Sequence, residues 1–449
     1  MHAKCSTMKQ YVVLLTTTVL LAWPWPATSA TLRADLTHVD SDRGFTKHEL
    51  LRRMVVRSRA RAAKLCPSGS GRANTKPVTA PVVSGATEVG STEYLMHFGI
   101  GTPRPQHVAL VLDTGSDVTW TQCRPCFKCF PQSLPTFDTS ASNTVRSVAC
   151  SDPLCQGLQP HDCLLRGCTY RIDYGDNSLS IGPLAKDTFT FQGKGGTVSV
   201  PDLAFGCAQY STGNYMSSQS GLAGFSRGPV SLPGQLKVSS FSYCFTSVFE
   251  SKSSPVFLGG TDDLRAHATG PILSTPFVQN PRDYPVYYYL SLKGVTVGKT
   301  RLPVPESAFA LKADGSGGTI IDSGSAVTTF PRAVFGSLRE AFVAQVPLPH
   351  TSYDEDKDLL QCFSTESVPD ASKVPVPKLV LHLEGADWDL PRDNYMVDHP
   401  DRNQLCLALA SAGDDDRTII GNFQQQNMHI VHDLVGNKLV IVPVQCDKM

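Results

Sequence analysis

Two short segments of the chain share a pattern of residues that suits acid–base chemistry. Residues 111–116 read Val-Leu-Asp-Thr-Gly-Ser, and residues 320–325 read Ile-Ile-Asp-Ser-Gly-Ser. Each aspartate precedes an apolar-apolar-glycine sequence, at 222–224 and at 419–421, and the intervals from aspartate to glycine are 111 and 99 residues. The repeat indicates two similar halves that contribute one aspartate each, with a seam near residues 260–280.

One Asp-Thr/Ser-Gly sequence is weak evidence, because these residues favour turns of many kinds. Two copies with matching flanks are stronger evidence, so we take Asp113 and Asp322 as the candidate catalytic pair. The aliphatic residues predict a strand that carries each aspartate to the floor of a cleft, where a glycine permits a tight turn. The neighbours expected to orient the two carboxylates are Thr114, Gly115, Ser116, Ser323, Gly324 and Ser325.

Two carboxylates a few ångströms apart cannot both be ionised, so one pKa rises, the other falls, and the pair shares one proton. The ionised member accepts a proton from a water molecule lying between them. The protonated member polarises the carbonyl group that this water attacks. Such chemistry needs neither a metal nor a cofactor, and we expect none.

The chain from residue 83 onward is rich in short strand-like segments. Runs at 94–100, 108–112 and 287–292 contain many aliphatic and aromatic residues, with Gly, Pro and Asp at their boundaries. Helical patterning is sparse, and its best example spans residues 332–343. This distribution predicts β-barrels or sandwiches rather than alternating strands and helices.

Residues 1–30 have the layout of a secretory signal peptide. Two lysines precede an uncharged apolar stretch at 11–23, and small residues at 27–30 suit cleavage. Pro24 interrupts the stretch too early for a typical spanning helix, although an N-terminal anchor is the alternative. We expect a protein of the secretory pathway, extracellular or vacuolar, with no membrane anchor.

Residues 31–82 form a basic segment with eleven Lys/Arg and four Asp/Glu. A Ser/Gly/Pro-rich linker closes it at 67–81. A basic amphipathic helix would also suit DNA or a membrane surface. We favour a removable propeptide that masks an acidic cleft, and we expect no nucleic-acid partner. The apolar positions that fit one helical stripe, with arginines opposite, are 50, 51, 54, 55, 62 and 65.

The formal net charge of zero conceals an uneven distribution. Residues 1–82 carry thirteen Lys/Arg and four Asp/Glu, a net charge of +9. The remaining residues carry 27 Lys/Arg and 36 Asp/Glu, a net charge of −9. The basic leader is therefore complementary to the acidic body, and acid would weaken their attraction by protonating carboxylates.

Cysteine usage agrees with an oxidising compartment. Twelve of the fourteen cysteines fall between Cys123 and Cys446, and seven of these crowd into residues 123–168. The C-x2-C-x2-C spacing at residues 123–129 would also suit zinc or a redox motif. So many cysteines in one region of a secreted chain favour six disulfides over a metal site.

These motifs and their flanks resemble the pepsin-like aspartic proteases (family A1), and in particular their nepenthesin-type plant branch. Residues 113–123 are similar to the first catalytic loop of this branch, residues 224–232 to its next segment, and residues 419–427 to its last. The cysteine-rich insert at 123–168 is the mark of the branch. The resemblance implies an aspartic endopeptidase made as a zymogen, a monomer that acts on extended polypeptides at acidic pH.

The fold that the resemblance implies is mainly all-β and bilobal, a double β-barrel with pseudo-twofold related lobes and a cleft between them. We expect the N-terminal lobe at 83–262 and the C-terminal lobe at 263–449. The resemblance also implies a hairpin flap in which Tyr174 faces the substrate and Trp120 hydrogen-bonds it; read alone, these residues suit a surface hairpin and a core tryptophan. The implied disulfides are Cys123–Cys126, Cys129–Cys207, Cys150–Cys168, Cys155–Cys163, Cys244–Cys446 and Cys362–Cys406.

Three positions depart from the family pattern. Ser325 replaces a threonine but keeps the hydroxyl group, and Asn177 replaces a flap glycine but tolerates a positive φ. Ala223 replaces a larger aliphatic residue, which predicts looser packing near Asp113.

Parts of the sequence also suit three other functions. The Gly-Phe-Ser-Arg-Gly sequence at 224–228 fits a serine-hydrolase elbow, but the chain lacks the β/α alternation of that fold. A catalytically inactive inhibitor or binding protein is a second alternative, and the presence of both aspartates argues against it. A plastid DNA-associated protease is a third, and it would require residues 1–30 to be a transit peptide.

Overall fold

The computed structural model describes residues 31–40, 44–65, 94–158, 161–164, 167–174, 177–193, 196–250, 252–260, 264–281, 286–351, 360–413 and 416–449. The predicted signal peptide at 1–30, the linker at 67–81 and the predicted start of the body at residue 83 lie outside these ranges. No helix within them is both long and apolar enough to cross a membrane.

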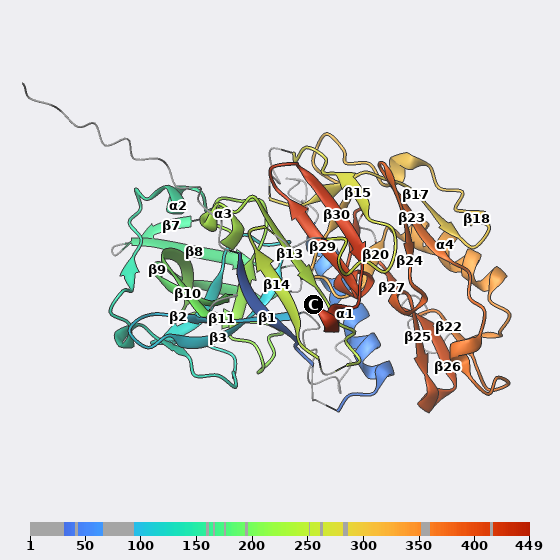
Figure 1. Ribbon diagram of the computed structural model, residues 1–449, viewed down its shortest axis with the longest axis horizontal. Coiled ribbons are helices and arrows are strands. Elements are labelled where there is room, and N and C mark those ends of the chain that lie inside the picture. The colour runs from blue at the N-terminus through green and yellow to red at the C-terminus, as the bar shows by residue number, and fades with distance from the viewer. Residues whose placement is uncertain are drawn as a thin grey trace, which may run out of the picture.

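Strands dominate the structure, as the sequence predicts, and they fall into two halves (Figure 1). One large closed sheet contains β1 (Leu32–His38), β2 (Tyr94–Ile100), β3 (Gln106–Asp113), β4 (Trp120–Arg124), β5 (Phe137–Asp138), β6 (Arg146–Ser147), β7 (His161–Leu164), β8 (Gly167–Asp173), β9 (Leu179–Gly193), β10 (Gly196–Ala208), β11 (Tyr210–Thr212), β12 (Gly221–Gly224), β13 (Ser240–Cys244), β14 (Ser254–Leu258), β15 (Leu273–Pro276), β29 (Met428–Asp433) and β30 (Lys438–Pro443).

Three smaller sheets build most of the second half. The first contains β16 (Tyr289–Leu290), β19 (Thr319–Ile321), β28 (Thr418–Ile420), β20 (Thr328–Phe330) and β27 (Leu409–Ser411). The second contains β18 (Thr300–Arg301), β17 (Leu292–Val297), β23 (Leu379–Leu383) and β24 (Ala386–Leu390). The third contains β21 (His350–Thr351), β22 (Cys362–Ser364), β26 (Gln404–Leu407) and β25 (Met396–His399).

Helices are few in the described part of the chain. The α-helices are α1 (Lys47–Leu65), α2 (Pro153–Gln156), α3 (Leu232–Leu236) and α4 (Arg332–Gln345). The helix predicted at 332–343 is therefore confirmed as α4, which buries Val334, Phe335, Leu338 and Phe342.

Each aspartate lies at the end of a strand that pairs in parallel with the strand of its downstream glycine. β3 runs beside β12, with Asp113 opposite Gly224. β19 runs beside β28, with Ile320 opposite Ile419. The aliphatic residues before each aspartate are buried, as parallel strands covered on both faces require. The apolar-apolar-glycine sequences are thus the strand partners of the two aspartate strands.

The large sheet crosses the predicted lobe boundary at 262/263. β29 pairs with β13, and β30 pairs with β15, so the last strands of the chain return to the sheet that holds β1 to β14. The division at 262/263 stays a prediction.

The basic N-terminal segment is integrated into the body. β1 pairs with β14 on one side and with β2 on the other. The sequence did not predict this strand. α1 lies between the two halves of the molecule (Figure 1) and packs on β20, β25 and β27. The buried stripe of α1 is confirmed by Leu50, Leu51, Met54, Val55 and Ala62.

Arginines do not all lie opposite that stripe, and the expectation is wrong for Arg57. This side chain is buried, with Nη2 3.9 Å from Oδ2 of the equally buried Asp40. A buried guanidinium is tolerated where a carboxylate offsets the loss of hydration. Asp40 lies two residues after the end of β1, so this pair joins the two elements of the basic segment.

The twelve body cysteines form six disulfides, but four of the expected pairings are wrong. The structure agrees with expectation for Cys244–Cys446 and Cys362–Cys406. It replaces Cys123–Cys126 and Cys129–Cys207 by Cys123–Cys207 and Cys126–Cys129. It replaces Cys150–Cys168 and Cys155–Cys163 by Cys150–Cys163 and Cys155–Cys168.

The strand pairing explains the first exchange, because β4 runs parallel to β10 with Cys207 opposite Thr121, two residues before Cys123. The Cα atoms of Cys123 and Cys207 are then 5.2 Å apart. In the second cluster, Cys163 and Cys168 face each other across the β7–β8 hairpin. Ligand-type atoms of Cys155, His161 and Cys163 lie within 4.8 Å of one another, so the alternative pairings compete within one small volume. Both of these cysteines are in disulfides, so neither offers a thiolate to a metal.

Candidate active site

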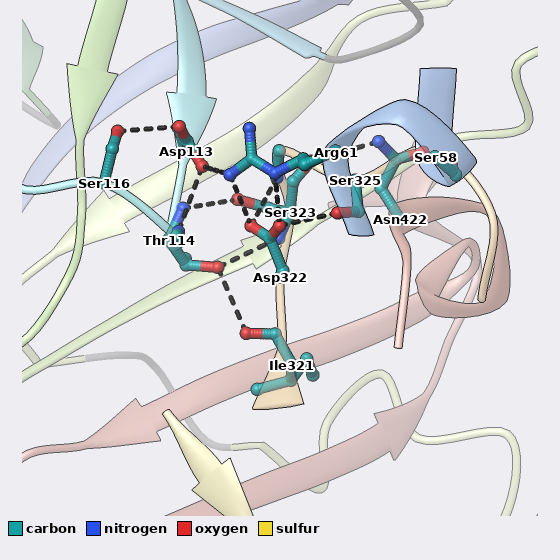
Figure 2. A network of polar contacts seen from close by, with 12 residues as sticks. Ser58, Arg61, Asp113, Thr114, Ser116, Ile321, Asp322, Ser323, Ser325 and Asn422 are labelled. Carbon is teal, nitrogen blue, oxygen red and sulfur yellow. Dashed lines mark hydrogen bonds and ion pairs between the residues drawn. The ribbon is translucent and has the colours of Figure 1, made fainter. Parts of the chain in front are cut away.

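Asp113 and Asp322 are fully buried and lie side by side, inside matching sets of hydrogen bonds (Figure 2). The amide of Gly115 donates to Asp113 Oδ1 at 3.0 Å, and Ser116 Oγ donates to Oδ2 at 2.6 Å. Asp322 receives equivalent bonds, from the amide of Gly324 at 3.0 Å and from Ser325 Oγ at 2.6 Å.

The two glycines explain how the carboxylates come so close. A Cβ atom on Gly115 would lie 2.8 Å from Asp322 Oδ1, and one on Gly324 would overlap the carboxylate of Asp113. Each loop therefore packs its glycine against the opposite aspartate, which a residue with a side chain would prevent.

Hydroxyl groups of the two loops cross-link them. The amide of Thr114 donates to Ser323 Oγ at 3.0 Å, and the amide of Ser323 donates to Thr114 Oγ1 at 2.9 Å. Thr114 Oγ1 donates in turn to the carbonyl of Ile321, and Ser323 Oγ donates to that of Leu112. These reciprocal bonds between Thr114 and Ser323 fix the spacing of the two loops. The structure thus brings together all eight residues of the predicted dyad and its surroundings.

The environment of Asp322 favours its protonated form. Burial raises the pKa of Asp322, and the neighbouring Asp113 carboxylate raises it further. The Arg61 guanidinium and the bonds from Ser325 and Gly324 oppose this rise in pKa. A buried carboxyl group with a raised pKa beside a second carboxylate is the arrangement in which one proton is shared.

Arg61 of α1 lies between the two carboxylates (Figure 2). Its Nη2 atom is 2.6 Å from Asp113 Oδ1 and 3.3 Å from Asp322 Oδ1, and its Nε atom is 2.8 Å from Asp322 Oδ2. The side chain is only 14% exposed. Arg61 thus occupies the space between the two carboxylates.

Other residues of α1 hold the helix in this position. The amide of Val327 donates to Ser58 Oγ at 2.8 Å. Ala62, directly after Arg61, is buried in an apolar cluster with Tyr289, Ile320 and Ile419. These contacts fix α1 on the second half of the molecule on both sides of Arg61.

The hydrogen bond expected between Trp120 and Tyr174 is present. Tyr174 follows β8 directly and is 92% buried, and Trp120 Nε1 donates to its hydroxyl oxygen at 2.6 Å. Burial, and then the charge of Asp113, raise the pKa of Tyr174 well above its ordinary value, so the phenol stays neutral. Asn177 has a φ of 70°, as expected where the family has glycine.

The serine of the Gly-Phe-Ser-Arg-Gly sequence at 224–228 has a structural contact with a neighbouring aspartate. Ser226 Oγ donates to Asp117 Oδ1 at 2.8 Å. Asp117 is mostly buried, and burial raises its pKa to about 6 against the bonds from Ser226 and from the amides of Ser231 and Val230. Ser226 therefore anchors a loop beside the dyad.

The sequence alone did not reveal the individual position of Arg61. It predicted a basic helix over an acidic cleft, but eleven Lys/Arg in residues 31–82 gave no reason to select one. A signal was present, because Arg61 lies seven residues after Met54, and positions i and i+7 share one face of a helix. An arginine beside an apolar stripe lies at the edge of the packed face.

The chain matches two family models in succession. Residues 94–260 match the model described as the xylanase inhibitor N-terminal domain, and residues 287–442 match that of the xylanase inhibitor C-terminal domain. Among solved structures, the chain is similar to that titled edgp, with a TM-score of 0.65 and 20% identity over 80% of this chain and 93% of that one. It is also similar to soybean basic 7S globulin, with a TM-score of 0.63 and 17% identity over 79% and 94%. At these identities the likeness concerns the fold.

Curated relatives are more similar in sequence. Aspartic proteinase nepenthesin-1 of Nepenthes gracilis is 38% identical over 412 residues, which cover 92% of this chain and 89% of that protein. Nepenthesin-2 of the same plant is 37% identical over 92% of this chain and 90% of its own length. Aspartyl protease family protein 2 of Arabidopsis thaliana is 37% identical over 81% and 73%. With this identity, coverage and fold, the chain belongs to the pepsin-like aspartic protease family, in the branch of the nepenthesins.

Proposed function

We propose that this chain is the zymogen of an aspartic endopeptidase that hydrolyses peptide bonds at acidic pH through Asp113 and Asp322. The observation that carries the proposal is the matching pair of hydrogen-bond sets around the two buried carboxylates, with donors at 3.0 and 2.6 Å in each. Matched donor sets at one point between two similar halves are what a shared-proton dyad requires.

In the proposed reaction a water molecule lies between the carboxylates after α1 has left. The raised pKa of Asp322 supports this residue as the member that holds the proton. Asp113 accepts a proton from the water while the oxygen atom of the water attacks the carbon of the peptide carbonyl. Asp322 polarises this carbonyl group through its proton. Asp113 then passes this proton to the amide nitrogen, the carbon–nitrogen bond breaks, and an acid and an amine leave. The reaction needs no metal or cofactor.

Zymogen closure is supported by Arg61. With the guanidinium hydrogen-bonded to both carboxylates, neither the water nor the substrate carbonyl has space in the dyad. Two further contacts hold the basic segment in place: the ion pair of Asp40 with Arg57, and the packing of Ala62 against an apolar cluster of the body. Acid would weaken this closure, because a protonated carboxyl group no longer attracts the basic helix.

The proposed partners are extended polypeptide substrates and the chain's own basic segment, with no nucleic acid and no second subunit. Six disulfides among the described residues support folding in an oxidising compartment. We therefore propose the secretory pathway, with the apoplast or the vacuole as destination.

The test is to acidify the purified full-length precursor and follow cleavage of an unfolded protein between pH 3 and 6. We expect cleavage below about pH 5, inhibition by pepstatin, and no cleavage by Asp322→Asn. Asp202→Asn is the matched control, since Asp202 is exposed on β10 and already has a φ of 65°, which asparagine tolerates. N-terminal sequencing of the product would locate the processing site.

Robust cleavage by Asp322→Asn would disprove the dyad mechanism. A wild-type chain that releases its basic segment in acid, yet cleaves nothing, would favour the alternative of an inactive inhibitor or binding protein.

A further inference from the structure

Part of the cysteine-rich insert is hydrogen-bonded to β11 and to the residue before it. The Cys126–Cys129 disulfide closes a small loop, and this loop lies alongside β11. The amide of Phe127 donates to the carbonyl of Gln209 at 2.9 Å, and the amide of Ser211 donates to the carbonyl of Lys128 at 2.6 Å. The insert thus adds an edge to β11.

Phe130, the residue directly after this loop, has its backbone fixed from the interior. Its amide donates to Gln122 Oε1 at 3.0 Å, and Gln122 Nε2 donates back to its carbonyl at 3.0 Å. Gln122 belongs to β4 and is fully buried. The ring of Phe130 is therefore held at a defined place rather than displayed on a loose loop.

That ring begins a row of aromatic side chains that ends at the flap. Phe130 stacks on Tyr215, with ring centroids 4.6 Å apart and an interplanar angle of 30°. Tyr215 meets Trp120 edge-on at 5.4 Å, and Trp120 donates to the Tyr174 hydroxyl at 2.6 Å. Stacked and edge-to-face pairs add directional preference to apolar burial. Phe130 thus limits the positions that the Tyr215 ring can adopt.

Tyr215 and Tyr174 line one pocket beside the dyad. The apolar residues Val111 and Leu222 complete its inner wall, and α1 covers it with Arg57, Ser58 and Arg61. The segment of Tyr215 also touches the flap directly, because the amide of Asn214 donates to Ser178 Oγ at 3.1 Å. Once α1 leaves, this pocket faces the substrate next to Asp113.

We infer that Phe130 is a positioning residue for substrate selection: by stacking on Tyr215 it sets one wall of the pocket, so that the cysteine-rich insert determines which side chain the enzyme accepts beside the scissile bond. The inference rests on the proposed function and adds a role for the insert. The favoured substrate is a peptide with a large apolar or aromatic side chain there. Without the Phe130 ring, Tyr215 can turn away and the wall loses contact with such a side chain.

The test compares two fluorogenic peptides that differ only at the residue entering this pocket, Phe in one and Ala in the other. For Phe130→Ala we expect the ratio of kcat/KM for the Phe peptide to that for the Ala peptide to fall about five- to tenfold, since apolar pocket contacts discriminate on this scale. The fall should come from a higher KM for the Phe peptide. Cleavage of the Ala peptide, which does not reach the wall, should change less than about twofold.

Phe127→Ala is the matched control, because Phe127 lies in the Cys126–Cys129 loop just before Phe130 but is 79% exposed. The Phe130→Tyr variant should have the same ratio of kcat/KM values as the wild-type enzyme, because it keeps the stacked ring. Phe130→Leu, a milder variant for use if Phe130→Ala does not fold, should give an intermediate ratio.

An unchanged ratio in Phe130→Ala and Phe130→Leu would overturn the inference. An equal loss on both peptides would also overturn it, since that result indicates a general structural role. A wild-type enzyme that cleaves neither peptide nor an unfolded protein would instead count against the proposed function.

Discussion

Arg61 donates two hydrogen bonds to Asp322, from Nε to Oδ2 at 2.8 Å and from Nη2 to Oδ1 at 3.3 Å. The same Nη2 reaches Asp113 Oδ1 at 2.6 Å. This fork uses the planar geometry of a guanidinium, which an ammonium group cannot reproduce. One residue of the basic segment therefore hydrogen-bonds both carboxylates and fills the space between them.

Replacing Arg61 should open the dyad of the intact precursor. At pH 6 we expect the Arg61→Ala precursor to bind pepstatin, measured by calorimetry, whereas the wild-type precursor does not. Arg61→Lys should bind it weakly, because it keeps the charge but loses the fork. Arg52→Ala is the control, since Arg52 is an exposed residue of the same helix. If Arg61→Ala still excludes pepstatin, closure depends on the rest of α1.

Acid should loosen α1 at a second place, where His48 of the helix meets His399 of β25 edge-on at 5.1 Å. Burial lowers the pKa of His399 to about 4, and the charge of His48 contributes to this decrease. The positive charges of Lys47 and Arg402 lower the pKa further, whereas the negative charge of Asp401 raises it. Release of α1 would return the pKa of His399 toward about 6.5. The released state therefore binds the extra proton, so closure weakens as pH falls from about 6.5 to 4.

His399→Phe removes this titration and keeps an aromatic ring. We expect the pH midpoint for conversion of the precursor to the shorter chain, followed by gel electrophoresis, to move toward lower pH. His350→Phe is the control, since His350 is exposed on β21. A midpoint that stays in place would show that His399 takes no part in release.

Asp117 should make the protein more stable in acid. Because burial raises its pKa to about 6, the folded state keeps a proton that the unfolded chain loses near pH 4. Its contribution is present below the unfolded pKa and is lost as pH rises through about 6, and it amounts to about 3 kcal/mol. In Asp117→Asn we expect a smaller fall in Tm between pH 4 and 7, measured by calorimetry. Asp162→Asn, at an exposed position, should keep the wild-type slope; parallel curves for Asp117→Asn and the wild type would contradict the assignment.

The disulfides of the insert should map as Cys150–Cys163 and Cys155–Cys168. Combined cleavage after Arg166 and before Asp152 and Asp162 separates all four cysteines into different peptides. Mass spectrometry of the unreduced digest should then find 147–151 joined to 162–166, and 152–161 joined to 167–171. Peptides joined as 147–151 with 167–171 would restore the pairing expected from the family resemblance.

The sequence predicted that the two aspartate loops lie side by side, and it could do so because the information is local. Two aliphatic residues, an aspartate, hydroxyl groups and a glycine form a unit whose geometry hardly depends on the rest of the chain, and the repeat pointed to its partner. The downstream glycine sequences were recognised, and their physical meaning as parallel strand partners emerged only from the register of β3 with β12 and of β19 with β28.

Long-range features were harder to predict. The pairing of Cys123 with Cys207 depends on the parallel register of β4 and β10, which spacing does not encode. The strand β1 was missed because a seven-residue segment gains its partners from β2 and β14, far along the chain. Arg61 was missed because its role depends on where a whole helix docks.

The position of β1 has a consequence for how activation proceeds in time. Cutting the chain beyond α1 would leave β1 joined noncovalently to β14 and β2, so a nicked, two-chain form should precede the free enzyme. While the chain is intact, the proposed closure is intramolecular and should reverse with pH. After the cut and the departure of β1, closure becomes a bimolecular event that dilution suppresses. Activation should therefore show hysteresis: a return to neutral pH before the cut restores the closed precursor, and the same return afterwards does not.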